Sequence, residues 1–137
     1  EFRRVLFRSV TIIAITMKNK KTLVLGASEK IDRYSNRAVS QLRMHGHDVV
    51  AIGRKTGSIE DVEITTATPE IKDLDTITLY LNPANQKPYY DYILGLSPKR
   101  IIFNPGTENP TIYTLLNSHN IECVEACTLV LLSLNSY

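Results

Sequence analysis

The residues best suited to bind a ligand follow the first apolar run of the sequence, residues 22–25. Small side chains let the chain turn sharply there and bring backbone N–H groups close to an anion. The pattern predicts a phosphate-binding loop, with a guanidinium suited to a diphosphate, made of Gly26, Ala27, Ser28, Arg33, Tyr34, Ser35 and Asn36. The alternative is that Gly26 serves only the turn, that Ser35 or Asn36 caps the following helix, and that Arg33 is solvated.

The end of the second apolar run, residues 49–52, is basic. A domain that binds NAD usually has an acidic residue at this point, which hydrogen-bonds the ribose hydroxyls. Here the chain continues with Gly53, Arg54 and Lys55. Such cations can instead hold a phosphate on the ribose, as in NADP or coenzyme A (CoA), so NAD is disfavoured. The alternative is a pair of solvated charges in a turn.

Two later loops, each following an apolar run, complete the predicted binding residues with Asn82, Pro83, Asn104, Pro105 and Gly106. Glu108 lies just beyond them, before the next expected helix. Its carboxylate could act as a general base, but an acidic residue that complements the N-terminus of that helix is the favoured interpretation.

A histidine and two cysteines, His119, Cys123 and Cys127, are spaced four residues apart. On one continuous helix they would align as soft metal ligands. Asn120 should end that helix, and residues 121–124 are typical of a strand, so the three side chains should scatter without a fourth ligand. Buried, inert cysteines and no metal site are therefore predicted. A reactive Cys127 thiol would need a lowered pKa.

Two periodicities alternate along the chain and predict the elements that position these residues. Short apolar runs are typical of buried strands, and apolar residues at i, i+3, i+4 and i+7 are typical of helices. The predicted strands are 22–25, 49–52, 62–64, 76–81, 100–103 and 121–124, and the predicted helices are about 35–45, 89–96 and 112–119. This order predicts a single α/β domain with a doubly wound, mostly parallel sheet and helices on both faces, a Rossmann-like fold. Ligands of such sheets bind beyond the carboxyl ends of the strands.

Length and composition exclude several classes of protein. The 137 residues fit one domain, and 43% hydrophobic with 22% charged residues is typical of a folded, water-soluble chain. The formal charge of +2 comes from the first eight residues, so residues 17–137 are neutral and nucleic-acid binding is not expected. Two cysteines make no disulfide framework, and no run reaches the ~18 apolar residues of a membrane span. A cytoplasmic protein without membrane contact is predicted.

Two segments and one histidine lie outside this pattern. Residues 1–16 are interpreted as an extension, either an artefact that resembles the in-frame translation of a sequencing adapter or an unstructured tail, which leaves 17–137 as the domain. The apolar segment 129–134 is expected to pack on the sheet or on a second copy of the chain. A homodimer or another protein partner therefore stays open. His47, at a helix-to-strand turn, is expected to cap or to pack.

Several of these motifs together resemble the small stand-alone CoA-binding-domain proteins, which are similar to the CoA-binding domain of the succinyl-CoA synthetase alpha subunit. The resemblance covers residues 20–134 and rests chiefly on G-A-S at 26–28, R-Y-S-N at 33–36 and N-P-G-T-E-N at 104–109. It implies that the CoA phosphates are held by Gly26, Ala27, Ser28, Arg33, Ser35 and Asn36. It also implies that Arg54 and Lys55 lie near the ribose phosphate or adenine, and that Asn82 and Pro83 border the pantetheine path. The phosphorylated histidine of the synthetase belongs to a later domain that these residues do not include.

Three functions are consistent with the residues. The favoured hypothesis is noncatalytic binding of CoA or an acyl-CoA, a small-molecule nucleotide ligand. An NADP-binding sensor or reductase-like domain would use the same fold and the same Arg54 and Lys55. An enzyme acting on a CoA thioester would use Glu108 or Cys127.

Overall fold

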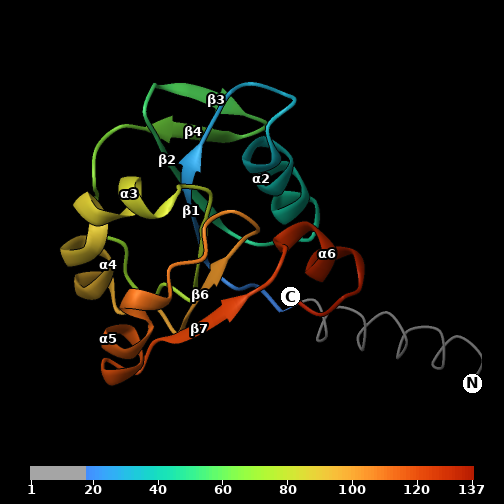
Figure 1. The fold of residues 1–137 in the computed structure, drawn as a ribbon. Helices are drawn as coiled ribbons and strands as arrows, with labels where there is room; N and C mark the ends of the chain where they lie inside the picture. The colour runs from blue at the N-terminus through green and yellow to red at the C-terminus, as the bar shows by residue number, and fades with distance from the viewer. Residues whose placement is uncertain (1–17) are drawn as a thin grey trace, which may run out of the picture.

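A computed structural model describes residues 18–137, and the predicted extension 1–16 lies outside the described residues. The strands are β1 (Thr22–Ala27), β2 (Val49–Gly53), β3 (Gly57–Ile59), β4 (Val62–Thr65), β5 (Thr76–Leu79), β6 (Arg100–Phe103) and β7 (Glu122–Glu125). They form a seven-stranded sheet in the order β3-β4-β2-β1-β5-β6-β7 (Figure 1). Every neighbouring pair is parallel except β3 and β4, which are antiparallel.

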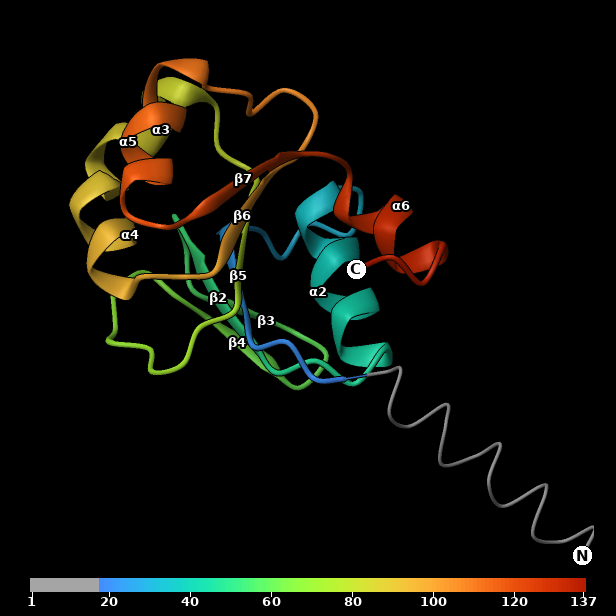
Figure 2. The same cartoon turned by 90° about the horizontal axis from the view of Figure 1, so that it is seen from below.

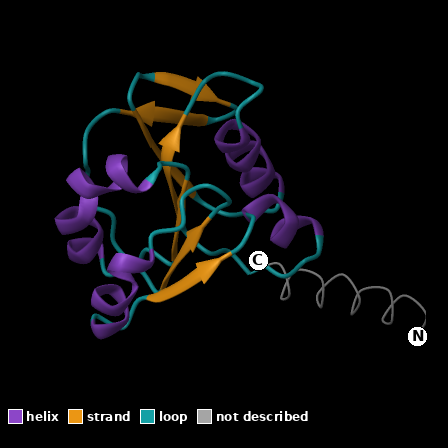
Figure 3. Cartoon of the chain, in the orientation of Figure 1, coloured by secondary structure: helices purple, strands orange, loops and turns teal. Residues whose placement is uncertain are grey.

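Helices cover both faces of this sheet (Figure 1, Figure 2). On one face lie α2 (Tyr34–Met44) and α6 (Thr128–Ser133), and on the other lie α3 (Pro83–Gln86), α4 (Tyr90–Leu96) and α5 (Tyr113–Ser118). Figure 3 shows the strands as a layer between the two groups of helices. Since β1 has β2 on one side and β5 on the other, the chain winds in both directions from β1. Among residues 18–137, the helices are too short or too polar to cross a membrane.

Two apolar layers join the sheet to its helices. Leu23 and Leu25 of β1 pack in the layer that contains Ile93 of α4, whereas Val24 packs in the layer that contains Leu132 of α6. All of these side chains are buried, and each contributes about 1.5–3 kcal/mol of burial free energy. Because both faces of the sheet are covered, its strands appear in the sequence as continuous apolar runs.

The predicted fold is confirmed, and the differences lie in short elements. The predicted helix at 35–45 is α2, and the predicted strand at 62–64 is β4. β3 and α3 escaped prediction because a three-residue strand and a one-turn helix are too short to show a period. The closing apolar segment forms α6, which packs on the sheet through Leu132 and leaves Val130 and Leu134 exposed.

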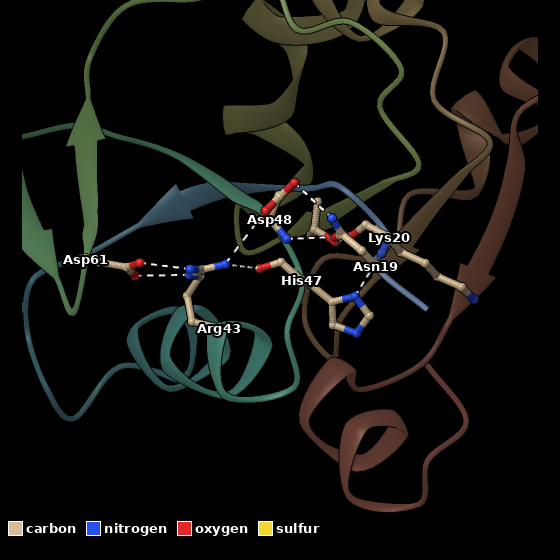
Figure 4. Close-up of polar contacts among 7 residues, drawn as sticks. Asn19, Lys20, Arg43, His47, Asp48 and Asp61 are labelled. Carbon is tan, nitrogen blue, oxygen red and sulfur yellow. Dashed lines mark hydrogen bonds and ion pairs between the residues drawn. The ribbon is translucent and has the colours of Figure 1, made fainter. Parts of the chain in front are cut away.

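Polar contacts hold the amino edge of the sheet (Figure 4). Arg43, near the end of α2, donates to the Asp61 carboxylate at 3.0 and 2.8 Å and to the His47 carbonyl oxygen at 2.7 Å. Asn19 and Asp48 exchange two hydrogen bonds of 2.9 Å. These contacts fix α2 against the β3–β4 turn and against the segment that precedes β1.

Candidate functional site

The parallel strands end at one edge of the sheet, and all the predicted binding loops leave from that edge. The backbones approach closely there. A Cβ on Gly53 would lie 2.3 Å from the Ala27 carbonyl oxygen, and a Cβ on Gly26 would lie 3.0 Å from the Tyr80 backbone. Gly26 also has a φ of +101°, which favours glycine. The two glycines therefore let the ends of β2, β1 and β5 converge beside the β1–α2 loop.

The N-terminus of α2 begins in this loop without a side-chain cap. Arg33 occupies the N-cap position with no capping hydrogen bond, and the first turn contains no acidic residue. Ser35 and Asn36 are buried instead, and the Asn36 amide donates to the Ser28 carbonyl oxygen at 3.1 Å. The alternative that Ser35 or Asn36 caps the helix is therefore wrong. The uncapped end of this 11-residue helix attracts anions through its N–H groups and its dipole.

Three predicted cations, Arg33, Arg54 and Lys55, lie at the same edge with exposed side chains. The ion pairs within residues 18–137 use Arg43 and Lys99 instead. Solvated cations beside an uncapped helix end are available to a polyphosphate. Their contact with a ligand stays a prediction.

Glu29 joins the β1–α2 loop to β3. Its carboxylate accepts a hydrogen bond from the Ser58 N–H at 3.0 Å and fills the space beside Gly57, where a Cβ would lie 2.6 Å from it. Gly53, which ends β2, has no room for a side chain. The acidic residue that ends the second strand of an NAD-binding sheet therefore has no counterpart at that position.

The loop after β5 places Asn82 and Pro83 at the start of α3. The Asn82 side chain accepts a hydrogen bond of 2.9 Å from the first turn of α3, and both residues are exposed. Gln86, at the end of α3, is fully buried and donates to the carbonyl oxygens of Leu81 at 2.9 Å and Thr107 at 2.7 Å. It thus joins the loops after β5 and β6. Sequence reasoning missed Gln86, because glutamine in a polar stretch is usually on the surface.

The loop after β6 is held by the buried side chain of Asn104. Its amide nitrogen donates to Thr78 Oγ1 at 2.7 Å and to a β5 carbonyl at 2.8 Å, and its Oδ1 accepts from the Thr128 N–H at 2.8 Å. These bonds connect β5, β6 and α6. Pro105 and Gly106, beside it, are exposed. Of the three binding residues predicted in this loop, Asn104 has its polar atoms engaged by the protein itself.

A buried polar network extends from this loop through Asn109. The Asn109 amide donates to Gln86 Oε1 at 3.0 Å and to the Tyr90 hydroxyl at 2.8 Å. Tyr113 donates to Glu125 at 2.8 Å, and burial, followed by this hydrogen bond, raises the pKa of Tyr113 to about 12. Buried polar groups are costly unless they are hydrogen-bonded, so these partners explain the loop's amides without a ligand.

The family model described as a CoA binding domain matches residues 20–133. This chain belongs to the CoA-binding-domain family. The resemblance drawn from the sequence motifs is therefore confirmed, and the family supports a small-molecule ligand that contains CoA. No curated protein matches the chain significantly.

Solved structures agree with this assignment. One, described as an uncharacterized protein, is 47% identical with a TM-score of 0.85, over 88% of this chain and 99% of that chain. A Thermus thermophilus protein is 18% identical with a TM-score of 0.76, over 93% of this chain and 97% of its own. A hypothetical protein from Pyrococcus horikoshii OT3 is 22% identical with a TM-score of 0.74, over 88% of this chain and 86% of its own. The last two show the fold alone.

The side chains considered as a general base or as metal ligands in this CoA-binding domain have ordinary structural surroundings. Glu108 is exposed, and its carboxylate accepts a hydrogen bond from the Gly106 N–H at 2.8 Å. Burial raises the pKa of Cys123 to about 11, which keeps this thiol protonated at neutral pH. His119, Cys123 and Cys127 lie at the end of α5, in β7 and before α6, as the predicted scatter requires. Residues 18–137 hold no cluster of three or more metal-ligating side chains.

An open hollow of about 690 Å³ lies between α2, β3 and α6. Its lining includes the carboxylates of Glu29, Asp32 and Glu60, together with the guanidinium of Arg37. Three carboxylates disfavour a polyphosphate, because like charges repel. The hollow shares Asn36 with the N-terminus of α2, so it borders the candidate anion site rather than forming it.

Proposed function

We propose that this CoA-binding domain binds CoA or an acyl-CoA without catalysing a reaction, with the ligand's diphosphate at the N-terminus of α2. The observation that carries the proposal is the state of that helix end. No side chain caps it, its first turn has no acidic residue, and the exposed Arg33 stands at the N-cap. A diphosphate there would accept hydrogen bonds from the helix N–H groups and pair with the guanidinium.

The rest of the ligand would lie along the same edge of the sheet. Arg54 and Lys55, exposed after β2, would face the ribose phosphate or adenine. The pantetheine arm would pass Asn82 and Pro83, which are exposed after β5. Asn82 would keep its hydrogen bond to α3, so its contribution would come from surface contact.

Two observations support a noncatalytic role. The Asn104 side chain is fully engaged between β5, β6 and α6, and the Glu108 carboxylate accepts the Gly106 N–H. Neither group is poised next to a nucleophile or a base in the way that acyl transfer needs. An acyl-CoA incubated with the protein should stay intact in chromatography, and its hydrolysis would favour the enzyme hypothesis.

An NADP-binding domain is the second candidate, because Arg54 and Lys55 would suit its ribose phosphate equally well. The deciding experiment is native mass spectrometry of the full chain purified from cells, followed by release and identification of any bound molecule. Calorimetric titration with CoA, acetyl-CoA and NADP then ranks the ligands. Bound CoA or acyl-CoA supports the proposal, whereas uptake of NADP but not CoA supports the alternative. The same mass spectra report whether the protein, which exposes Val130 and Leu134, forms a dimer.

A further inference from the structure

Tyr137 occupies a site at the amino edge of the sheet, away from the candidate ligand site. Its hydroxyl lies 2.6 Å from Thr22 Oγ1, and its carbonyl oxygen accepts a hydrogen bond from Lys20 Nζ at 2.6 Å. The Arg100 guanidinium lies 4.5 Å from the centre of the Tyr137 ring, and the His47 ring lies 4.9 Å from it. These five residues form what is called here the Tyr137 latch.

The latch holds the segment that follows α6. The start of α6 is fixed at the opposite edge of the sheet, where the Thr128 N–H donates to Asn104. In the middle, Leu132 packs into the core. After the end of α6, the exposed residues 134–136 lead to Tyr137. The Asn135 and Ser136 N–H groups donate to carbonyl oxygens of α6 at 3.2 and 2.8 Å, so opening the latch would free Tyr137 while α6 stays bound.

His47 is the titratable group of the latch. Its Nδ1 accepts a hydrogen bond from the Lys20 backbone N–H at 2.9 Å, so this nitrogen carries no proton (Figure 4). Burial lowers the pKa of His47, and the nearby cations His45, Lys20 and Arg100 lower it further, whereas Asp75 opposes them. A proton on Nδ1 would face the Lys20 N–H and add a positive charge beside Lys20 and Arg100.

We propose that the Tyr137 latch is acid-sensitive, and that protonation of His47 releases Tyr137. The inference is independent of the CoA site. In the latched state the Tyr137 ring lies against the His47 ring, so release of Tyr137 would open the imidazole to water and let it bind a proton more tightly. Release is therefore favoured as the pH falls below the ordinary histidine value of ~6.5, and the latched state is fully favoured above it.

The test is an NMR titration of the full chain from about pH 7.5 to 5, around the ordinary histidine pKa. We expect the amide signals of residues 134–137 to move with the same midpoint as the His47 ring. His47→Gln retains a hydrogen-bond acceptor but cannot titrate, so it should abolish the movement. His119→Gln is the matched control and should leave it unchanged. Amide signals of residues 134–137 that do not move as His47 titrates would overturn the proposal.

A second variant tests the same coupling from the other side. Tyr137→Ala should raise the titration midpoint of the His47 ring, because a proton that weakens the Tyr137 contact must in turn be bound more weakly when Tyr137 is in place. An unchanged His47 midpoint in Tyr137→Ala would also overturn the proposal. This variant leaves every core residue in place, so it decides the question even if His47→Gln fails to fold.

Discussion

Two loops at the same edge of the sheet are built in opposite ways. The β1–α2 loop exposes Arg33 and Tyr34 beside an uncapped helix, whereas the loop after β6 buries Asn104 and Asn109 and uses their amides on protein partners. Both loops have small and polar residues of the kind that predicts binding. The difference teaches that such a motif favours a ligand only where its polar groups stay unsatisfied. Where they are satisfied, the motif holds the scaffold.

The largest effect is expected from a substitution in the loop after β6, whose polar groups bind protein partners. Asn104→Ala removes the partner of Thr78 Oγ1, of a β5 carbonyl and of the Thr128 N–H, all in the interior. Thr78 Oγ1 keeps the Thr128 hydroxyl as its other partner, whereas the Thr128 N–H loses its side-chain acceptor. We expect the free energy of unfolding to fall by about 3 kcal/mol, since each buried group left unpaired costs about 1–3 kcal/mol. Urea denaturation followed by circular dichroism measures this loss. The exposed Asn117→Ala in α5 should stay within about 0.5 kcal/mol of the unchanged protein. Equal losses in the two variants would remove the distinction between the loops.

A substitution in the β1–α2 loop should change the affinity for the ligand rather than the stability of the protein. Arg33→Ala should weaken CoA binding by about 1–3 kcal/mol, the scale of a lost charge-assisted contact. Its free energy of unfolding should change by less than about 0.5 kcal/mol, because the side chain is exposed. Calorimetry measures the affinity, and Lys72→Ala, which removes an exposed cation before β5, is the control. Unchanged affinity in Arg33→Ala would show that this arginine is only a surface residue.

A smaller effect separates backbone strain from packing. Gly106 has a φ of +92° with open space around it, so Gly106→Ala should cost about 1 kcal/mol of stability through the backbone alone. Gly95 in α4 also has open space but has no positive φ. Gly95→Ala should therefore stabilise the protein by about 0.5–1 kcal/mol. Thermal denaturation shows the two signs, and a stabilising Gly106→Ala would contradict the explanation.

The smallest effect is expected at Glu108. Glu108→Gln retains an oxygen that can accept the Gly106 N–H, so stability should change by less than about 0.5 kcal/mol. Neither the unchanged protein nor the Glu108→Gln variant should alter an acyl-CoA during long incubation, as chromatography would show. Turnover by the unchanged protein that disappears in Glu108→Gln would instead make Glu108 a general base.

Local pattern was enough to predict the strands, the longer helices and the loops at the carboxyl edge of the sheet. Leu23 and Leu25 lie in a continuous apolar run, which is typical of a strand covered on both faces, and Gly26 ends that run. The same reasoning missed Gln86 and did not foresee the protein partners of Asn104, whose ligand role stays a prediction. Both are buried by elements distant in the sequence, and a polar side chain carries no local mark of such burial.

By itself, the sequence determined the period of each element, the family and the place of the candidate anion site, because these follow from neighbouring residues. Only the tertiary structure decided which polar groups are satisfied. Asn104 binds Thr128, 24 residues away, and Tyr137 reaches Thr22, 115 residues away. Hydrogen bonds of this kind form only when the sheet brings distant segments together. The choice between an open site and a closed scaffold therefore depends on the packing of the whole chain.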